Sequence, residues 1–273
     1  MSLEFKEFEP SSKVRGVIKS FFEIDYAENE LRKDFLLPNG APAFFMIRTS
    51  SSVDMNIMEV KNNIQIDQGI YIGYISTLAE FTHQKMHVIG AVIYPMYLYP
   101  LFEVTPKDLL NKYTRVSPIK ELQKLNENID DLSISESEFP VLMEQFVLDR
   151  LKMMEIRDDV KSLFKKLTGP DGYRLTVEEM AGEVGYTRRH LSDLFNKYLR
   201  MSPKQYVKLA RFNQGLKLIT EMNDGDTYAA VAHQLGYHDQ AHFIRDFKSI
   251  CGKTPSELKK LPESLAYQFR YFK

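Results

Sequence analysis

The chain has 273 residues, of which 44% are hydrophobic and 27% are charged. These proportions permit one large or two small domains with buried cores, and they argue against a disordered protein. The net charge of −1, taken alone, argues against a simple basic protein that binds nucleic acid. The total conceals a division, because residues 1–155 carry 16 basic and 23 acidic side chains (−7), whereas residues 156–273 carry 20 and 14 (+6). This asymmetry predicts two domains with different partners.

The residue inventory excludes several kinds of site. Cys251 is the only cysteine, which rules out an intramolecular disulfide and a cysteine-rich zinc site. Residues 1–10 lack the apolar core of a signal peptide, and the most apolar stretch, residues 88–102, is interrupted by two prolines. We therefore expect a cytoplasmic protein without a membrane span. The sequence has no glycine-rich phosphate loop and no Gly-x-Ser-x-Gly motif, so we expect neither an enzyme nor a cofactor.

Two histidines in the acidic half raise the question of a metal site. His83 and His87 are four residues apart, and Glu80 is the only obvious third ligand nearby. Residues 81–92 read as a strand, which would place both histidines on the same face of a sheet. They are either a metal pair or two histidines at the surface or lining a pocket. We favour the second alternative and expect no metal, because a full site needs a further ligand.

Residues 14–99 are rich in short runs of aromatic and β-branched residues, separated by turn formers such as Pro38-Asn39-Gly40. Strands are predicted at residues 21–26, 43–48, 64–66, 70–75 and 86–94. Many short strands at regular spacing predict an antiparallel sandwich or barrel.

Helical patterns follow this region. Residues 97–113 read as short helical turns, and Ser117-Pro118 predicts a helix through about residue 128. Apolar side chains recur at helical spacing over residues 137–154, which predicts a longer helix. Its apolar stripe fits either a dimer contact or packing within the chain, and we favour packing. A helix over 158–167 and a turn at 169–172 come next, and the chain reads as helical from there to residue 261.

The basic half contains an internal repeat. Ala181, Val184, Gly185 and Tyr186 match residues 51 positions later, which are Ala232, Leu235, Gly236 and Tyr237. After one inserted residue, matches occur 52 positions apart, and these pair Leu191, Phe195, Ser202 and Pro203 with Phe243, Phe247, Thr254 and Pro255. Chance does not easily produce so many matches.

Each copy predicts two helices joined by a sharp turn. The alanine permits close packing, and the glycine supplies the left-handed conformation that the turn needs. Thr187 or Asp239 caps the second helix, while Thr176 and Glu179 form a capping box before the first copy. This is the pattern of a helix-turn-helix, whose second helix can enter the major groove of DNA. One such pattern also matches many helical hairpins, but two copies in a basic region favour DNA.

Residues 203–222 read as one helix between the copies. About 18 residues at a rise of roughly 1.5 Å span about 27 Å. A rigid connector of this size could hold two recognition helices about one duplex turn, roughly 34 Å, apart.

Residues 156–261 resemble the AraC/XylS family of bacterial transcription regulators. The resemblance is carried by Glu-Met-Ala-Gly-Glu-Val-Gly-Tyr at 179–186, Arg-His-Leu-Ser-Asp-Leu-Phe at 189–195, Ser202-Pro203 and the run from Leu235 to Lys248. The first half is similar to a cupin-like sensor domain through Leu37-Pro38-Asn39-Gly40 and Gly-Ala-Val-Ile-Tyr-Pro at 90–95. The family implies an α+β chain, with an antiparallel β-barrel followed by two helix-turn-helix units on a long helix. The expected domains are a sensor at 1–115, a helical linker and candidate dimer region at 116–155, and a DNA-binding domain at 156–268.

The resemblance also implies which residues meet DNA. The base-reading candidates lie early on the second helix of each copy, and they are Arg188, Arg189, His190, Ser192, Asp193, Gln240, Ala241, His242, Ile244 and Arg245. Arginine can bond guanine, glutamine can bond adenine, and isoleucine or alanine can touch a thymine methyl group. The phosphate candidates are Thr187, Lys197, Lys204, Arg211, Asp239 and Lys248. For Arg211, a salt bridge inside the domain is an equal alternative.

Two positions depart from the family pattern. The carboxylate of Asp193 would repel phosphates, so we expect the second unit to discriminate bases more strongly. Arg200 stands where glycine is usual after the first recognition helix, whereas Gly252 keeps that glycine in the second unit. A left-handed Arg200 would cost about 1 kcal/mol.

The sequence therefore predicts a sequence-specific DNA-binding transcription regulator. Its expected partners are double-stranded DNA, a small-molecule effector or protein acting on the first half, and a second copy of the chain. One alternative is a cupin-like enzyme or carbohydrate-binding domain with an accessory helical domain, against which the missing metal-ligand set counts. The other is a regulator without a ligand, whose first half only dimerises.

Overall fold

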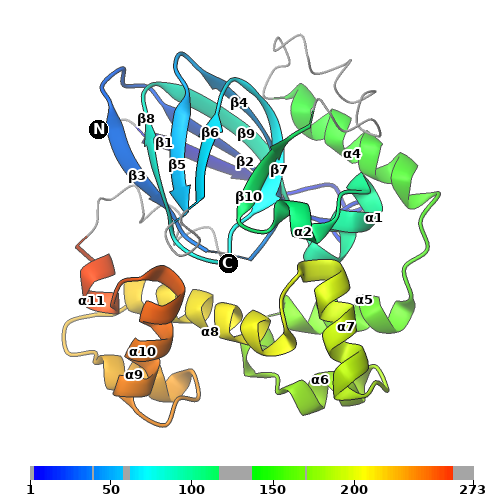
Figure 1. Cartoon of the computed structure of the whole chain (residues 1–273), viewed down its shortest axis with the longest axis vertical. Coiled ribbons are helices and arrows are strands. Elements are labelled where there is room, and N and C mark those ends of the chain that lie inside the picture. The colour runs from blue at the N-terminus through cyan, green and yellow to red at the C-terminus, as the bar shows by residue number, and fades with distance from the viewer. Residues whose placement is uncertain (1–2, 39, 58–61, 117–136, 170, 261–273) are drawn as a thin grey trace. The chain divides into compact units, whose positions relative to one another are not determined.

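The computed structural model describes residues 3–38, 40–57, 62–116, 137–169 and 171–260. Contacts along the chain divide it into two compact units (Figure 1). The first, which we call the β unit, comprises residues 1–34, 41–75 and 80–155. The second, which we call the helical unit, comprises residues 35–40, 76–79 and 156–273.

Ten strands form two sheets in the described part of the first half. The larger sheet has the order β1 (Leu3–Phe8), β2 (Ile18–Tyr26), β9 (Met86–Ile93), β4 (Ala43–Thr49), β7 (Gly69–Tyr74) and β10 (Lys112–Arg115). The smaller sheet has the order β3 (Arg32–Leu36), β8 (Ala79–His83), β5 (Val53–Ile57) and β6 (Asn62–Ile66). All neighbours in the larger sheet, and β5 with β6 in the smaller one, pair antiparallel. The predicted antiparallel, β-rich first half is confirmed.

The strand sequences account for which faces are buried. In β5, buried Val53, Met55 and Ile57 alternate with exposed Asp54 and Asn56, so one face packs inward and the other meets solvent. The inner strand β9 lies between β2 and β4, and its residues are buried or half-buried on both faces. Alternation therefore marks the half-exposed strands, and continuous apolar character marks the inner ones.

The strand predictions are confirmed with one exception. All five predicted strands are present, as β2, β4, β6, β7 and β9. The prediction of one strand over residues 81–92 is wrong, because the chain bends at Gln84 and Lys85 and continues in the other sheet. His83 on β8 and His87 on β9 consequently belong to different sheets, not to one face.

Each of these histidines lies beside a buried carboxylate. His83 Nε2 lies 3.0 Å from Asp34 Oδ2, and His87 Nε2 lies 2.9 Å from Glu23 Oε1. Glu80, the third metal ligand considered, pairs with Lys33 at 2.7 Å. Among the described residues, no three or more histidine, cysteine, aspartate or glutamate side chains are grouped so that they could hold a metal ion.

The helices in the described part of the β unit are η1 (Pro95–Tyr97), α1 (Leu98–Phe102), α2 (Pro106–Leu109) and α4 (Glu138–Leu151). In α4, Phe139, Met143 and Val147 are buried, and the Phe139 ring centroid lies 6.2 Å from that of Phe44 on β4. This part of the apolar stripe packs against the larger sheet, which is the alternative that the sequence favoured. The helix predicted from Ser117 lies outside the described residues.

The helical unit contains η3 (Gly172–Arg174) and seven described α-helices, which are α5 (Asp158–Leu167), α6 (Val177–Glu183), α7 (Arg188–Leu199), α8 (Pro203–Thr220), α9 (Tyr228–Gln234), α10 (Gln240–Cys251) and α11 (Pro255–Leu258). The long α8 packs against α7 and also against α9 and α10 (Figure 1). The predicted connecting helix and the α+β class are confirmed. Within the described residues, no helix is long and apolar enough to cross a membrane.

Candidate nucleic-acid interface

The first helix-turn-helix is formed by α6 and α7. Gly185 follows α6 with a φ of 65°, in the left-handed region that favours glycine. The next amide, that of Tyr186, donates to the carbonyl oxygen of Ala181 at 2.8 Å and so closes the end of α6. Thr187 then begins α7, because its Oγ1 accepts from the amide of His190 at 3.2 Å. The left-handed glycine and the Thr187 cap were predicted from the sequence and are confirmed.

The second helix-turn-helix, formed by α9 and α10, repeats this construction. Gly236 has a φ of 79°, and the Tyr237 amide donates to the Ala232 carbonyl oxygen at 2.9 Å. Asp239 caps α10, because its Oδ1 accepts from the His242 amide at 2.7 Å. That hydrogen bond, more than any other interaction, lowers the pKa of the Asp239 carboxyl below its ordinary value.

Capping boxes extend the repeat beyond the two turns. In each box the hydroxyl oxygen of the first residue accepts a hydrogen bond from the backbone amide of the residue three positions later. The side chain of that later residue in turn accepts a hydrogen bond from the backbone amide of the first residue. They begin α6, α8 and α11 and pair Thr176 with Glu179, Ser202 with Gln205, and Thr254 with Glu257. The capping box predicted before the first copy is confirmed.

Each recognition helix, α7 or α10, has one buried and one exposed face. Leu191 and Phe195 on α7, and Phe243 and Phe247 on α10, are at most 1% exposed. The base-reading candidates lie on the other side and are all exposed except Ile244, which is half-buried. The structure thus brings these candidates onto the two surfaces that a duplex could approach, while their contacts with DNA stay predictions.

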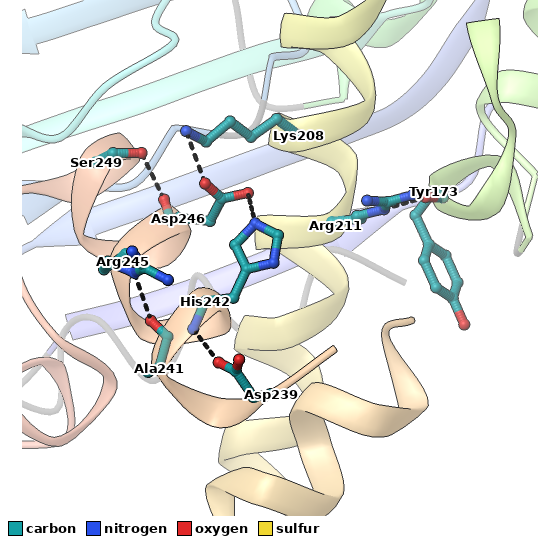
Figure 2. A network of polar contacts seen from close by, with 9 residues as sticks. All are labelled: Tyr173, Lys208, Arg211, Asp239, Ala241, His242, Arg245, Asp246 and Ser249. Carbon is teal, nitrogen blue, oxygen red and sulfur yellow. Dashed lines mark hydrogen bonds and ion pairs between the residues drawn. The ribbon is translucent and has the colours of Figure 1, made fainter. Parts of the chain in front are cut away.

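Two of the candidate arginines have partners within the unit. Arg188 forms an ion pair with Glu178 on α6, so DNA would have to compete with that carboxylate for its guanidinium. Arg245 Nε donates to the carbonyl oxygen of Ala241 at 3.3 Å (Figure 2). Both side chains stay exposed.

Asp246 links α10 to α8, a role that the sequence analysis missed. Its Oδ1 lies 3.1 Å from Lys208 Nζ on α8, and its Oδ2 lies 4.0 Å from His242 Nε2 one turn earlier on α10 (Figure 2). Burial raises the pKa of Tyr237 to about 12, and the nearby Asp246 carboxylate adds to the increase while Arg211 opposes it. The four-residue spacing of His242 and Asp246 was the one signal for this network in the sequence.

The phosphate candidates fall into three groups. Lys197, Lys204 and Lys248 are exposed near helix ends, where a duplex could reach them. Thr187 and Asp239 use their side chains as the caps described above. Arg211 points inward, because its Nε donates to the carbonyl oxygen of Tyr173 at 3.0 Å (Figure 2). Arg211 therefore makes a contact inside the helical unit, as in the alternative of an internal salt bridge, but its partner is a carbonyl oxygen instead of a carboxylate.

The helix ends differ between the two units at one position. Arg200 follows α7 with a φ of 55°, and Gly252 follows α10 with a φ of 69°. Both residues are therefore left-handed, as expected if the family geometry is retained. Arginine pays roughly 1–2 kcal/mol for this conformation, and glycine does not.

Comparisons with known proteins agree with this geometry. Residues 180–261 match a family described as "Helix-turn-helix domain". The Msm operon regulatory protein of Streptococcus mutans is 26% identical over 121 residues, which are 44% of this chain and 43% of that protein. The lactose operon transcription activator of Staphylococcus xylosus is 34% identical over 73 residues, 27% of this chain and 25% of that protein. The chain thus spans less than half the length of these relatives.

A solved structure can be aligned with most of the chain. The alignment with ToxT from Vibrio cholerae covers 94% of this chain and 98% of the ToxT chain, with a TM-score of 0.47 and 14% sequence identity. The family match and the relatives confirm the expected resemblance to AraC-type regulators in the basic half. Residues 180–261 thus match a helix-turn-helix domain.

Proposed function

We propose that the chain is a sequence-specific DNA-binding transcription regulator that reads one duplex with both helix-turn-helix units. The observation that carries the proposal is the pair of turns at Gly185 and Gly236, each followed by a capped helix with a buried aromatic face and an exposed polar one. The surplus of positive charge in residues 156–273 supports it, because phosphate contacts supply most non-specific affinity. The family match and the names of the relatives point the same way.

The two recognition helices would contribute unequally to discrimination between bases. Arg188 and Arg189 on α7, and Gln240 and Arg245 on α10, have the donors that read guanine and adenine in the major groove. Asp193 places a carboxylate on the exposed face of α7, where it repels phosphate. The helix α10 would therefore contribute more of the discrimination between bases.

The β unit would supply the signal. We propose that a small molecule, a protein or a second copy of the chain acts on it and changes DNA binding by shifting a conformational equilibrium. In this arrangement residues 1–115 are the sensor, 116–155 the linker and candidate dimer region, and 156–268 the DNA-binding domain. A regulator of this kind works in the cytoplasm, where bacterial DNA is found.

Selection from a pool of random duplexes tests the proposal. The full-length chain should enrich a site with two separate conserved segments, and affinity for that site should fall steeply as salt rises. The matched control is a variant with Arg188→Ala, Arg189→Ala, Gln240→Ala and Arg245→Ala, which keeps the three exposed phosphate lysines. It should still bind DNA but enrich no sequence. Failure of the natural chain to enrich any duplex, or a complex that is indifferent to salt, would overturn the proposal.

A further inference from the structure

The two turn tyrosines, Tyr186 and Tyr237, are equivalent in the repeat but are held by different parts of the chain. The Tyr186 hydroxyl donates to Asp159 Oδ2 on α5 at 3.3 Å. Burial, followed by the neighbouring carboxylate of Asp246 on the recognition helix α10 itself, raises the pKa of Tyr237. We call each tyrosine with its aspartate a tyrosine lock.

Cations and histidines surround the two rings in a similar way. The guanidinium carbon of Arg157 lies 5.5 Å from the centroid of Tyr186, and that of Arg211 lies 5.9 Å from the centroid of Tyr237. A recognition-helix histidine contacts each ring, with His190 stacked on Tyr186 at 4.1 Å and His242 edge-on to Tyr237 at 5.1 Å. Because their surroundings are similar, we infer that the two locks have the same positioning role in the two helix-turn-helix units.

The source of the carboxylate is the difference that matters. Leu194 occupies the place in α7, 52 residues earlier, that Asp246 occupies in α10, so α7 has no internal aspartate there. Asp159 takes its place, and its carboxylate also accepts from Arg157 Nε at 3.2 Å and Nη2 at 2.5 Å. The first lock is therefore tied to the start of α5.

The start of α5 is one of three places where the chain enters the helical unit, because residues 35–40 and 76–79 of the first half also belong to that unit. Arg157 is the N-cap residue of α5, and the main segment of the helical unit begins one residue before it, at Ile156. Only residues 152–157 separate α4 of the β unit from α5. A displacement of this segment would act on Arg157 and Asp159. The second lock lies in α10 and in the turn between α9 and α10.

We propose that Arg157 and Asp159 are positioning residues for the first recognition helix, and that through them the linker 152–157 regulates base reading by α7 but not by α10. The proposal rests on the proposed function, since it concerns how the same DNA is read. It assigns the two recognition helices different relations to this linker, with base reading by α7 dependent on it and base reading by α10 independent of it.

The test uses the full-length chain and the duplex that it selects from a random pool, with each base pair varied in turn. Arg188→Ala first identifies the half-site read by α7. Tyr186→Phe and Asp159→Asn should each reduce base preference by about threefold to tenfold in that half-site alone, and together by no more than one of them. The matched controls Tyr237→Phe and Asp246→Asn should change only the other half-site.

Linker insertion supplies a measurement that a purely structural role would not move. Two glycines inserted after Lys152 should weaken preference in the α7 half-site of the natural chain and should add nothing in Tyr186→Phe. Equal effects on both half-sites, or unchanged preferences in the lock variants, would overturn the inference. If the natural chain selects no duplex at all, it is the proposed function that fails.

Discussion

Arg245 and Lys248 lie one turn apart on α10, and their removal should have different consequences. Both side chains are exposed, and the bond that Arg245 makes within the unit is a 3.3 Å contact to a carbonyl of its own helix. Arg245→Ala should therefore leave folding almost unchanged. A base contact is worth about 1–3 kcal/mol, so affinity for the preferred duplex should fall about fivefold to 140-fold.

Lys248→Ala provides the matched comparison. Loss of one phosphate contact should weaken binding to all duplexes by a similar factor and should reduce the slope of log affinity against log salt by about 0.9. Arg245→Ala should instead relax preference at one base pair and leave the slope nearly constant. Titration of both variants against the preferred duplex and its single-base changes, at several salt concentrations, separates the two effects. Identical ranking of sites by Arg245→Ala and the natural chain would refute the assignment of α10 as a base reader.

Three further predictions concern stability. Gly252→Ala should destabilise the helical unit by about 1 kcal/mol in urea unfolding, because alanine is disfavoured in the left-handed backbone conformation and nothing lies within 4 Å of the added Cβ. The control, Gly182→Ala, lies inside α6 with equally open surroundings and should stabilise the helical unit slightly. The depressed pKa of Asp239 implies stability that is complete above the unfolded value of about 3.9 and is lost as pH falls through the lower folded value. Asp239→Asn should therefore flatten the acid limb of a curve of stability against pH. Phe247→Ala should cost about 3–5 kcal/mol in the same unfolding assay, because the ring is 1% exposed in an aromatic core.

Local chemistry explains which parts of the structure could be predicted from the sequence. Gly185 and Gly236 take left-handed backbones, and Thr187 and Asp239 cap the helices that follow, because such features depend on residues within one turn of each other. The buried face of α7 and α10 follows from helical spacing alone. The helix-turn-helix units were therefore predictable almost to the residue.

The features that sequence reasoning missed depend on distant partners. Asp159 is 27 residues from Tyr186, and Tyr173 is 38 residues from the Arg211 that bonds it. No spacing rule links such pairs, because the fold chooses them after the helices have formed. The bend at Gln84 and Lys85 was missed for a different reason, since neither residue is a usual turn former and apolar side chains continue on both sides.

The position of α8 has a consequence for how the helical unit unfolds. The buried ring of Tyr206 on α8 lies 5.8 Å from that of Phe195 on α7, in the first helix-turn-helix. The buried ring of Phe212 on α8 lies 4.6 Å from that of Phe247 on α10, in the second helix-turn-helix. A single helix thus completes both aromatic cores, so neither unit can lose its core without weakening the other. Although their sequences indicate a duplication, the two helix-turn-helix units should unfold together in one cooperative transition. Their most protected amide hydrogens should therefore exchange with similar free energies of opening.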